Sequence, residues 1–287
     1  MKQARPPIVT ILGHVDHGKT TLLDFIRKSS VASKEHGGIT QHIGAYQVEH
    51  GRKLITFIDT PGHAAFEKMR SRGAKVADIA MLVVAVDDGI MPQTIEAINH
   101  IQEAKVPMIV AVNKIDLAGI DTKVQLEKIK KQLSDRKVNL EEYGGDVPLV
   151  TLSAKTGEGV DKLLEMISLI AELHEIKGNP SLAAAGVVIE GNLDKFKGSI
   201  ATILVRNGSL KKGDVVTLGG VKSKIRGMFD YSGKAVEKVG PSTPVEVLGL
   251  EEVPMVGVTL GQEAEAKEEA AVKSLVDRLK QGESKTL

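Results

Sequence analysis

Cysteine is absent from this chain of 287 residues, and aromatic residues are scarce. Without cysteine, disulfides, thiolate catalysis and cysteine-based zinc or iron–sulfur sites are excluded. Aromatic residues make up 3% of the chain, too few for a platform on which nucleic acid bases stack. Positive charge is not in excess either. The 38 lysines and arginines balance 37 aspartates and glutamates, which excludes a protein held to nucleic acid by its overall charge.

Long hydrophobic runs are also missing. The longest apolar stretches, such as residues 79–86, are far too short to span a bilayer. Residues 1–7 carry no apolar core of a signal peptide. We therefore expect a soluble, cytoplasmic protein without a membrane partner, and the chain length suggests about two domains.

Up to about residue 178, short apolar runs alternate with segments of helical periodicity. The apolar runs cover residues 8–12, 54–58, 79–86, 108–112 and 148–152. The helical segments cover residues 19–28, 64–75, 93–103, 122–135 and 160–174. This alternation predicts an α/β domain at 1–178, with a doubly wound, mostly parallel sheet and helices on both faces. Runs 45–49 and 53–59 leave no room for a helix between them, which predicts a hairpin and one antiparallel strand at or near the sheet edge.

The chain from 179 to 261 is rich in glycine and lacks helical periodicity. Turn signals separate its β-rich runs at Gly191-Asn192, Asn207-Gly208, Lys212-Gly213-Asp214, Gly219-Gly220 and Ser232-Gly233. Such spacing predicts a small all-β barrel or sandwich. At 262–287, an apolar stripe predicts a C-terminal helix, which we expect to lead toward domains that this chain lacks.

The strongest motif is a phosphate-binding loop between the first strand and the first helix, Gly13-His14-Val15-Asp16-His17-Gly18-Lys19-Thr20. It matches G-x-x-x-x-G-K-[ST] in the context that this motif requires. Its glycines let backbone N–H groups converge on phosphate oxygens, and the helix N-terminus adds partial positive charge. We expect Lys19 to pair with the β- and γ-phosphates, the Thr20 hydroxyl to hold Mg²⁺, and Thr21 to complete the site.

Asn113-Lys114-Ile115-Asp116 predicts which base is bound. The segment ends a strand, at the carboxyl edge where ligands bind in open α/β sheets. Asp116 can accept two hydrogen bonds from guanine, while adenine offers no such pair of donors. We expect Asn113 to tie the loops together and the Lys114 stem to lie along the base. A later segment is expected to present a backbone N–H to guanine O6: Ser153-Ala154-Lys155.

Asp59-Thr60-Pro61-Gly62-His63 ends the third predicted strand. Asp59 is expected to hold Mg²⁺ through water, and the Gly62 N–H to reach a γ-phosphate. In the long loop before the hairpin, Thr40 is a candidate second hydroxyl on Mg²⁺, which would make these segments a switch that the γ-phosphate orders. His63 is the candidate catalytic residue, because a side chain there could orient the attacking water.

These motifs resemble those of the translational GTPases. Within that group, three further segments are similar to bacterial translation initiation factor 2: 37–46, 66–74 and 88–94. Residues 198–214 are similar to the β-barrel that follows the GTPase domain in this group. The resemblance covers nearly the whole chain, and the nucleotide motifs show no departure from the family pattern.

The resemblance implies a GTPase whose hydrolysis is triggered by the rRNA of the large ribosomal subunit, which positions the residue matching His63. Val15 and Ile39 match the apolar pair that screens this histidine from water before activation. Asp16 matches a residue that helps hold a monovalent cation beside the phosphates. The family promotes placement of initiator formyl-methionyl tRNA and joining of the ribosomal subunits, and the tRNA-binding domain is expected to be absent here. We expect a monomer.

Two alternatives stay open. In the first, nucleotide only sets the conformation of a binding module and intrinsic hydrolysis is negligible. In the second, the chain is another translational GTPase, such as a relative of elongation factor Tu. An ATP-using kinase or transporter with the same phosphate loop is disfavoured by Asn113 and Asp116.

Overall fold

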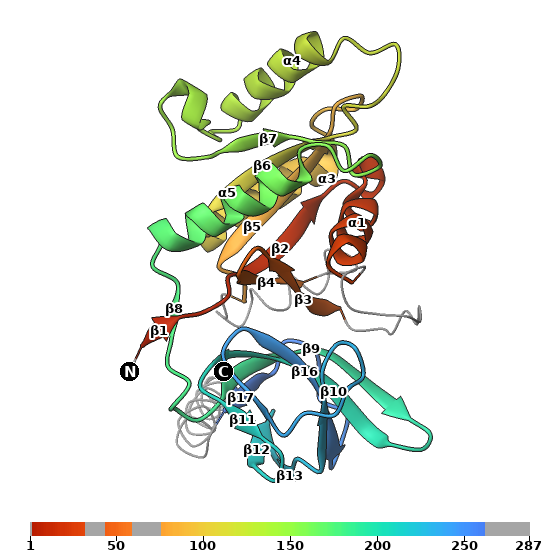
Figure 1. The fold of residues 1–287 in the computed structure, drawn as a ribbon, viewed down its shortest axis with the longest axis vertical. Helices are drawn as coiled ribbons and strands as arrows, with labels where there is room; N and C mark the ends of the chain where they lie inside the picture. The colour runs from red at the N-terminus through yellow and green to blue at the C-terminus, as the bar shows by residue number, and fades with distance from the viewer. Residues whose placement is uncertain (1, 32–43, 59–75, 262–287) are drawn as a thin grey trace, which may run out of the picture. The chain divides into compact units, whose positions relative to one another are not determined.

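The computed structural model describes residues 2–31, 44–58 and 76–261, and these divide into two compact units (Figure 1). One unit spans Ala4–Lys177, and the other begins at Gly178 and includes Gln3. The helices predicted at 64–75 and at 262–287 lie outside the described residues. None of the described helices is long and apolar enough to cross a membrane.

The unit Ala4–Lys177 is built on a six-stranded sheet with the order β3-β4-β2-β5-β6-β7. Its strands are β2 (Ile8–Gly13), β3 (Ala45–His50), β4 (Lys53–Ile58), β5 (Ile79–Ala85), β6 (Met108–Asn113) and β7 (Leu149–Thr151). All neighbouring strands are parallel except β3, which pairs antiparallel with β4 at the edge. The predicted mostly parallel sheet and its antiparallel edge strand are confirmed.

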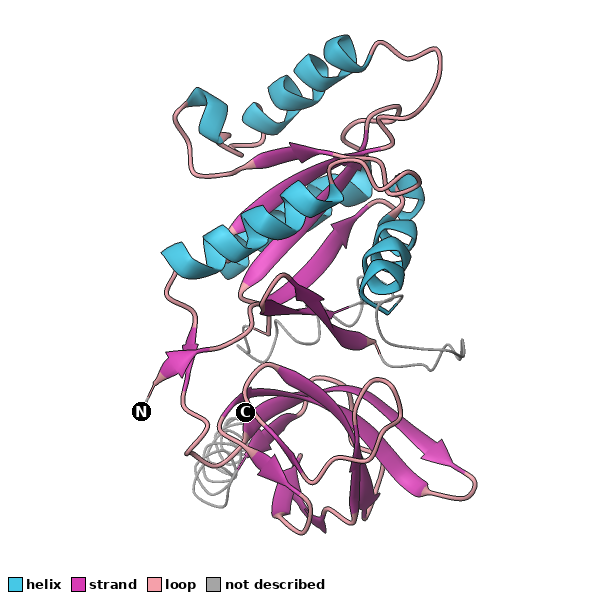
Figure 2. Ribbon diagram, in the orientation of Figure 1, coloured by secondary structure: helices cyan, strands magenta, loops and turns pink. Residues whose placement is uncertain are grey.

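Helices cover both faces of this sheet (Figure 2). They are α1 (Lys19–Val31), α3 (Pro92–Ala104), α4 (Thr122–Ser134) and α5 (Val160–Leu173), with short 3₁₀ turns η1 (Val15–His17) and η2 (Glu141–Tyr143). Two of these helices begin at a clear sequence signal. Pro92, which lacks an N–H, is the first residue of α3, and the Asp121 side chain caps α4 by accepting from the N–H groups of Lys123 and Val124.

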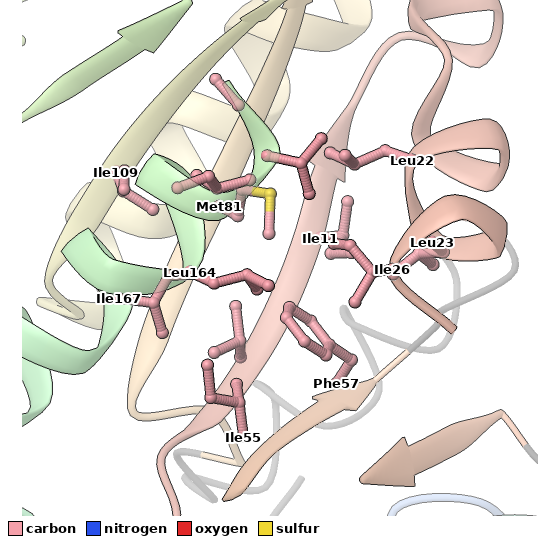
Figure 3. Close-up of a cluster of buried hydrophobic side chains, with 14 of the residues drawn as sticks. Ile11, Leu22, Leu23, Ile26, Ile55, Phe57, Met81, Ile109, Leu164 and Ile167 are labelled. Carbon is pink, nitrogen blue, oxygen red and sulfur yellow. The ribbon is translucent and has the colours of Figure 1, made fainter. Parts of the chain in front are cut away.

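Strand β5 shows why the core forms two layers. All seven of its residues are buried, and successive side chains point to opposite faces. Ile79, Met81 and Val83 pack with α1 and α5, whereas the alternate residues pack with α3 and α4. Figure 3 shows the first of these clusters, in which Phe57 lies beside Ile11 and Leu164.

The second unit is a curled, antiparallel half-barrel of seven strands within the described residues, in the order β13-β12-β17-β9-β10-β16-β14. These strands are β9 (Ala185–Asp194), β10 (Gly198–Asn207), β12 (Val215–Leu218), β13 (Val221–Lys224), β14 (Gly227–Phe229), β16 (Thr243–Leu250) and β17 (Thr259–Gly261). A further pair in this unit joins β11 (Leu210–Lys211) to β15 (Lys238–Val239). The short strands β1 (Gln3–Ala4) and β8 (Lys177–Gly178), where the two units meet in the sequence, pair with each other. The predicted all-β domain is confirmed.

One predicted turn is wrong. Gly191 and Asn192 lie inside β9, and the chain reverses after Asp194 instead. A Cβ at Gly191 would come within 2.5 Å of the carbonyl oxygen of Pro254. This glycine therefore permits a close approach of another backbone segment rather than a change of direction.

Candidate functional site

The candidate site residues that the structure describes gather at one edge of the parallel sheet. Strands β2, β5 and β6 are neighbours (Figure 1). Near their carboxyl ends, Gly13 stands opposite Val83 and Ala85 opposite Asn113. This is the edge at which open α/β sheets bind their ligands. The order of the strands thus joins segments that lie about a hundred residues apart in the sequence.

The phosphate loop, residues 13–20, depends on glycine at two close approaches. Gly13 has a φ of 139°, and a Cβ there would lie 2.3 Å from the carbonyl oxygen of Val83. Gly18 has a φ of 81°, and a Cβ there would lie 2.4 Å from Nδ2 of Asn113. Both the backbone conformation and the space exclude any larger residue, so the two glycines fix how tightly the loop folds.

Lys19 and the first turn of α1 make the loop suitable for an anion. The Lys19 ammonium donates to the carbonyl oxygens of Gly13, at 2.9 Å, and His14. It is thereby held over the loop beside the N-terminus of α1, where the helix adds partial positive charge. Thr20 and Thr21 are exposed in the same turn.

The Asn113 side chain joins three segments of the site. Its Nδ2 donates to the carbonyl oxygen of His17 at 2.9 Å, and its Oδ1 accepts from the N–H of Ala154 at 2.9 Å. Asn113, His17 and Ala154 are all buried. Because both ends of the amide are used, the phosphate loop and the segment 153–155 are held to the end of β6.

Asp116 and Lys114 are fixed by different partners. The Asp116 carboxylate is exposed and accepts from the Ser153 hydroxyl at 2.7 Å, which orients it toward the segment 153–155. Lys114 has a φ of 68°, and its ammonium lies 3.1 Å from Oδ2 of Asp87 and 3.7 Å from Oδ2 of Asp88. The carboxylate of Asp116 keeps an open side that can accept hydrogen bonds from a base.

His17 is fully buried although Val15 and Asp16 beside it are exposed. Its Nδ1 lies 3.2 Å from the carbonyl oxygen of Val83, and its Nε2 lies 3.8 Å from Oδ2 of Asp88. Burial lowers the pKa of His17, with the nearby His14 ring and Lys114 ammonium adding to the effect, against the opposing Val83 carbonyl and Asp88 carboxylate. The imidazole is therefore neutral at physiological pH.

The structure adds residues that the sequence analysis did not assign to the site. Asp87 and Asp88 follow β5 and hold Lys114. Gln93, near the start of α3, accepts through Oε1 from the N–H of Val15 at 3.2 Å. The signal for the two aspartates was their place after an apolar run that ends at this edge. Gln93 lay within the segment 88–94 that is similar to initiation factor 2, but no signal gave it a role in the site.

Several predicted site residues lie outside the described residues: Ile39, Thr40, Asp59, Gly62 and His63. The catalytic assignment and two of the Mg²⁺ assignments therefore stay predictions. Lys155 is described and exposed. Within the described ranges, no group of three or more His, Asp or Glu side chains could hold a metal ion. The exposed Thr20 hydroxyl, an oxygen donor beside the anion site, suits the hard Mg²⁺ ion.

Comparison with known families decides where the chain belongs. Residues 5–172, more than half of the chain, match the family described as the elongation factor Tu GTP binding domain. The chain belongs to this family of translational GTPases. Residues 183–263 match elongation factor G domain 2.

The predicted resemblance of this translational GTPase to initiation factor 2 is confirmed. Translation initiation factor IF-2 of Staphylococcus epidermidis is 51% identical over 304 residues, which cover 99% of this chain and 42% of the relative. The factor from Desulforamulus reducens is 54% identical over 253 residues, which cover 88% of this chain and 25% of the relative. The chain thus spans less than half the length of these relatives.

A solved structure agrees with the fold. GDP-bound aIF5B from Aeropyrum pernix superposes with a TM-score of 0.75 at 32% identity, and the match covers 96% of this chain and 58% of that one. The expected fold class, a GTPase domain followed by a β domain, is confirmed by this likeness and by the two family matches.

Proposed function

We propose that this chain is the GTP-binding and GTP-hydrolysing core of a bacterial translation initiation factor. The observation that carries the proposal is the Asn113 amide, which bonds the phosphate loop at His17 and the segment 153–155 at Ala154. The same segment holds the base-reading carboxylate of Asp116 through the Ser153 hydroxyl. A site that joins a phosphate cradle to such a carboxylate in this way suits a guanine nucleotide.

In this proposal each part of the site has one task. The backbone N–H groups of the phosphate loop and the Lys19 ammonium bind the β- and γ-phosphates. Asp116 accepts from the guanine N1–H and N2–H₂ groups, and the Ala154 segment lies beside guanine O6. Mg²⁺, when bound, neutralises charge that develops on the phosphates. Thr20, Thr40 and, through water, Asp59 would hold it.

His63 is proposed to orient the attacking water, with Val15 and Ile39 as the apolar pair that screens it. Val15 is 68% exposed, so its side chain is available for such contact. Asp16, also exposed, would help to hold a monovalent cation. Gly62 would donate its N–H to the γ-phosphate.

The biological setting belongs to the proposal as well. Large-subunit rRNA would trigger hydrolysis through His63, and the factor would promote initiator tRNA placement and subunit joining in the cytoplasm. We further propose that the chain is a monomer with a GTP-binding domain at 1–178, a β-barrel domain at 179–261 and a linking helix at 262–287.

Guanine recognition is tested by the base preference of an Asp116→Asn variant. We expect the wild-type chain to bind fluorescent GDP and the variant to prefer xanthosine diphosphate, because an amide can donate to the second carbonyl oxygen of xanthine. Asp121→Asn is the matched control, since that carboxylate caps α4 near the same loop. Guanine readout by Asp116 would be refuted if Asp116→Asn changed the affinities for GDP and xanthosine diphosphate by the same factor. A preference for the xanthine nucleotide in the control would refute it as well.

Hydrolysis is tested by multiple-turnover GTP cleavage, with and without ribosomes, for the wild type and His63→Ala. Strong ribosome stimulation that the variant loses is the expected result. His174→Ala, an exposed histidine after α5, is the control and should behave as the wild type. If GTP binds but ribosomes give no stimulation, the proposed ribosome-triggered hydrolysis is wrong for this chain, and the binding-module alternative is favoured.

A further inference from the structure

His17 is bonded on two sides by two different segments of the site. Its backbone carbonyl accepts from Nδ2 of Asn113, which begins the base-reading segment, residues 113–116. Its imidazole lies 3.2 Å from the carbonyl oxygen of Val83 in β5. The phosphate loop therefore rests on β6 through the main chain of His17 and on β5 through its side chain.

The two contacts belong to one closed chain of interactions. Val83 lies on the strand that leads to Asp87 and Asp88, and those carboxylates hold the ammonium of Lys114. Lys114 follows Asn113 directly, and Asn113 returns to His17. A shift of the base-reading segment would thus reach His17 from both sides.

The two partners of His17 are also the groups against which the loop's glycines pack. Gly13 leaves room for the carbonyl oxygen of Val83, and Gly18 leaves room for Nδ2 of Asn113. These approaches are too close for any Cβ, as the distances of 2.3 and 2.4 Å show. Hydrogen bonds to His17 hold both approaches in place, so the spacing of the loop's N–H groups depends on this residue.

The chemistry of the imidazole matches the contact. A carbonyl oxygen can only accept, so Nδ1 must carry the proton that it shares with Val83. The ring is fully buried, and burial lowers the pKa of His17, which leaves a neutral ring with a single N–H donor. A neutral donor at this depth supports the loop without adding a buried charge.

We propose that His17 is a positioning residue that couples the phosphate loop to the base-reading segment, so that recognition of guanine makes the loop bind the phosphates more tightly. The proposal rests on the guanine nucleotide site proposed above and goes beyond it. In this proposal His17 makes no contact with the nucleotide base. It acts through its contacts with Val83 and Asn113.

The test compares GDP with inosine diphosphate, which lacks the 2-amino group that Asp116 would read. The dissociation constants of both nucleotides are measured by competition against fluorescently labelled GDP. The proteins compared are the wild type, His17→Leu, His17→Gln and His17→Asn. For His17→Leu, loss of one buried hydrogen bond should weaken GDP binding about 5- to 30-fold. The preference for GDP over inosine diphosphate should also fall, roughly threefold or more, because the loop then keeps its main-chain bond to Asn113 but loses its side-chain support on β5.

His17→Asn is the rescue variant, since its amide nitrogen can take the position of ring Nδ1 and donate to Val83. It should keep the affinity within about threefold of the wild type and the preference within about 1.5-fold, well short of the loss expected for His17→Leu. In His17→Gln the amide lies farther out, toward Asp88, so the preference should fall as in His17→Leu. Should His17→Leu fail to fold, the contrast between Gln and Asn still decides the question.

Leu133→Ala is the control for a general loss of stability, because Leu133 is buried between α4 and the sheet, apart from the site. It should leave the preference for GDP over inosine diphosphate unchanged. The proposal is overturned if His17→Leu keeps the wild-type preference, whatever happens to its affinity, or if His17→Asn loses it. If the wild type itself fails to bind GDP or to prefer it, the proposed function fails instead.

Discussion

Replacing Asn113 by alanine should damage the site more than any other single truncation of a neutral side chain there. The change removes both hydrogen bonds of the amide and leaves two buried backbone groups without their partner, the carbonyl oxygen of His17 and the N–H of Ala154. His17 is 0% exposed and Ala154 is 4% exposed, so water does not reach these groups unless the loops open.

The magnitude follows from the desolvation of these two groups. A buried donor or acceptor left unpaired costs about 1–3 kcal/mol, so two cost about 2–6 kcal/mol. Loops at a sheet edge can open to admit water, so we take the lower part of this range, about 2–4 kcal/mol. Because 1.4 kcal/mol is a factor of ten, a site that must close again before it binds should lose roughly 30- to 700-fold in GDP affinity.

The assay combines thermal unfolding of the nucleotide-free protein with the dissociation constant of fluorescent GDP. Asn113→Ala should lower Tm by about 5–15 °C for a domain of this size. Asn192→Ala, whose exposed side chain in β9 bonds only Glu190 among the contacts we describe, is the control and should change neither quantity. A Tm drop below about 2 °C, together with less than threefold loss of affinity, would refute the reasoning.

Two further predictions concern stability. Lys130 is 8% exposed, and its ammonium lies 2.8 Å from Oε1 of Glu127 and 2.6 Å from Oε2 of Glu142. The two carboxylates raise the pKa of Lys130, and both are themselves more than half exposed. Changing both glutamates to glutamine leaves the buried ammonium unpaired and should lower the free energy of unfolding in urea by about 1–2 kcal/mol. Lys130→Met leaves only exposed carboxylates and should lower it by less than about 1 kcal/mol; the reverse order would contradict this reasoning. Gly13→Ala should cost about 2 kcal/mol or more and abolish GDP binding, because its Cβ would meet the Val83 carbonyl at 2.3 Å; an unchanged Tm in thermal unfolding would contradict it.

The sequence predicted the architecture well wherever a single segment carried its own signal. The apolar run at 79–86 became β5 at Ile79–Ala85, because a strand buried on both faces needs no polar alternation. The hairpin before it followed from loop length alone. The turn predicted at Gly191 was wrong, because a glycine that forms a turn and one that admits another backbone segment look alike in sequence. The neighbour that requires a glycine here, Pro254, lies far along the chain.

The candidate site divides in the same way. Its motif residues could be assigned because each lies at the end of a predicted strand, and parallel strands end at one edge. The contacts of Gln93 with Val15 and of His17 with Val83 could not, because they join side chains to backbone groups on other elements. Such bonds depend on distances within the folded unit that no local pattern encodes.

The neutral hydrogen bonds that join the segments of the site and its charged groups have different roles. Neutral groups make the bonds that join the phosphate loop to β5 and β6, namely the Asn113 amide and the His17 imidazole with their carbonyl partners. The ion pair of Lys114 with Asp87 is more than a quarter exposed on both sides and so adds little to stability. Salt screens exposed charges but not buried neutral hydrogen bonds. These two neutral bonds of the loop therefore do not weaken as ionic strength rises, whereas the Lys19 ammonium, which also bonds the Gly13 and His14 carbonyls, carries the charge that attracts a phosphate.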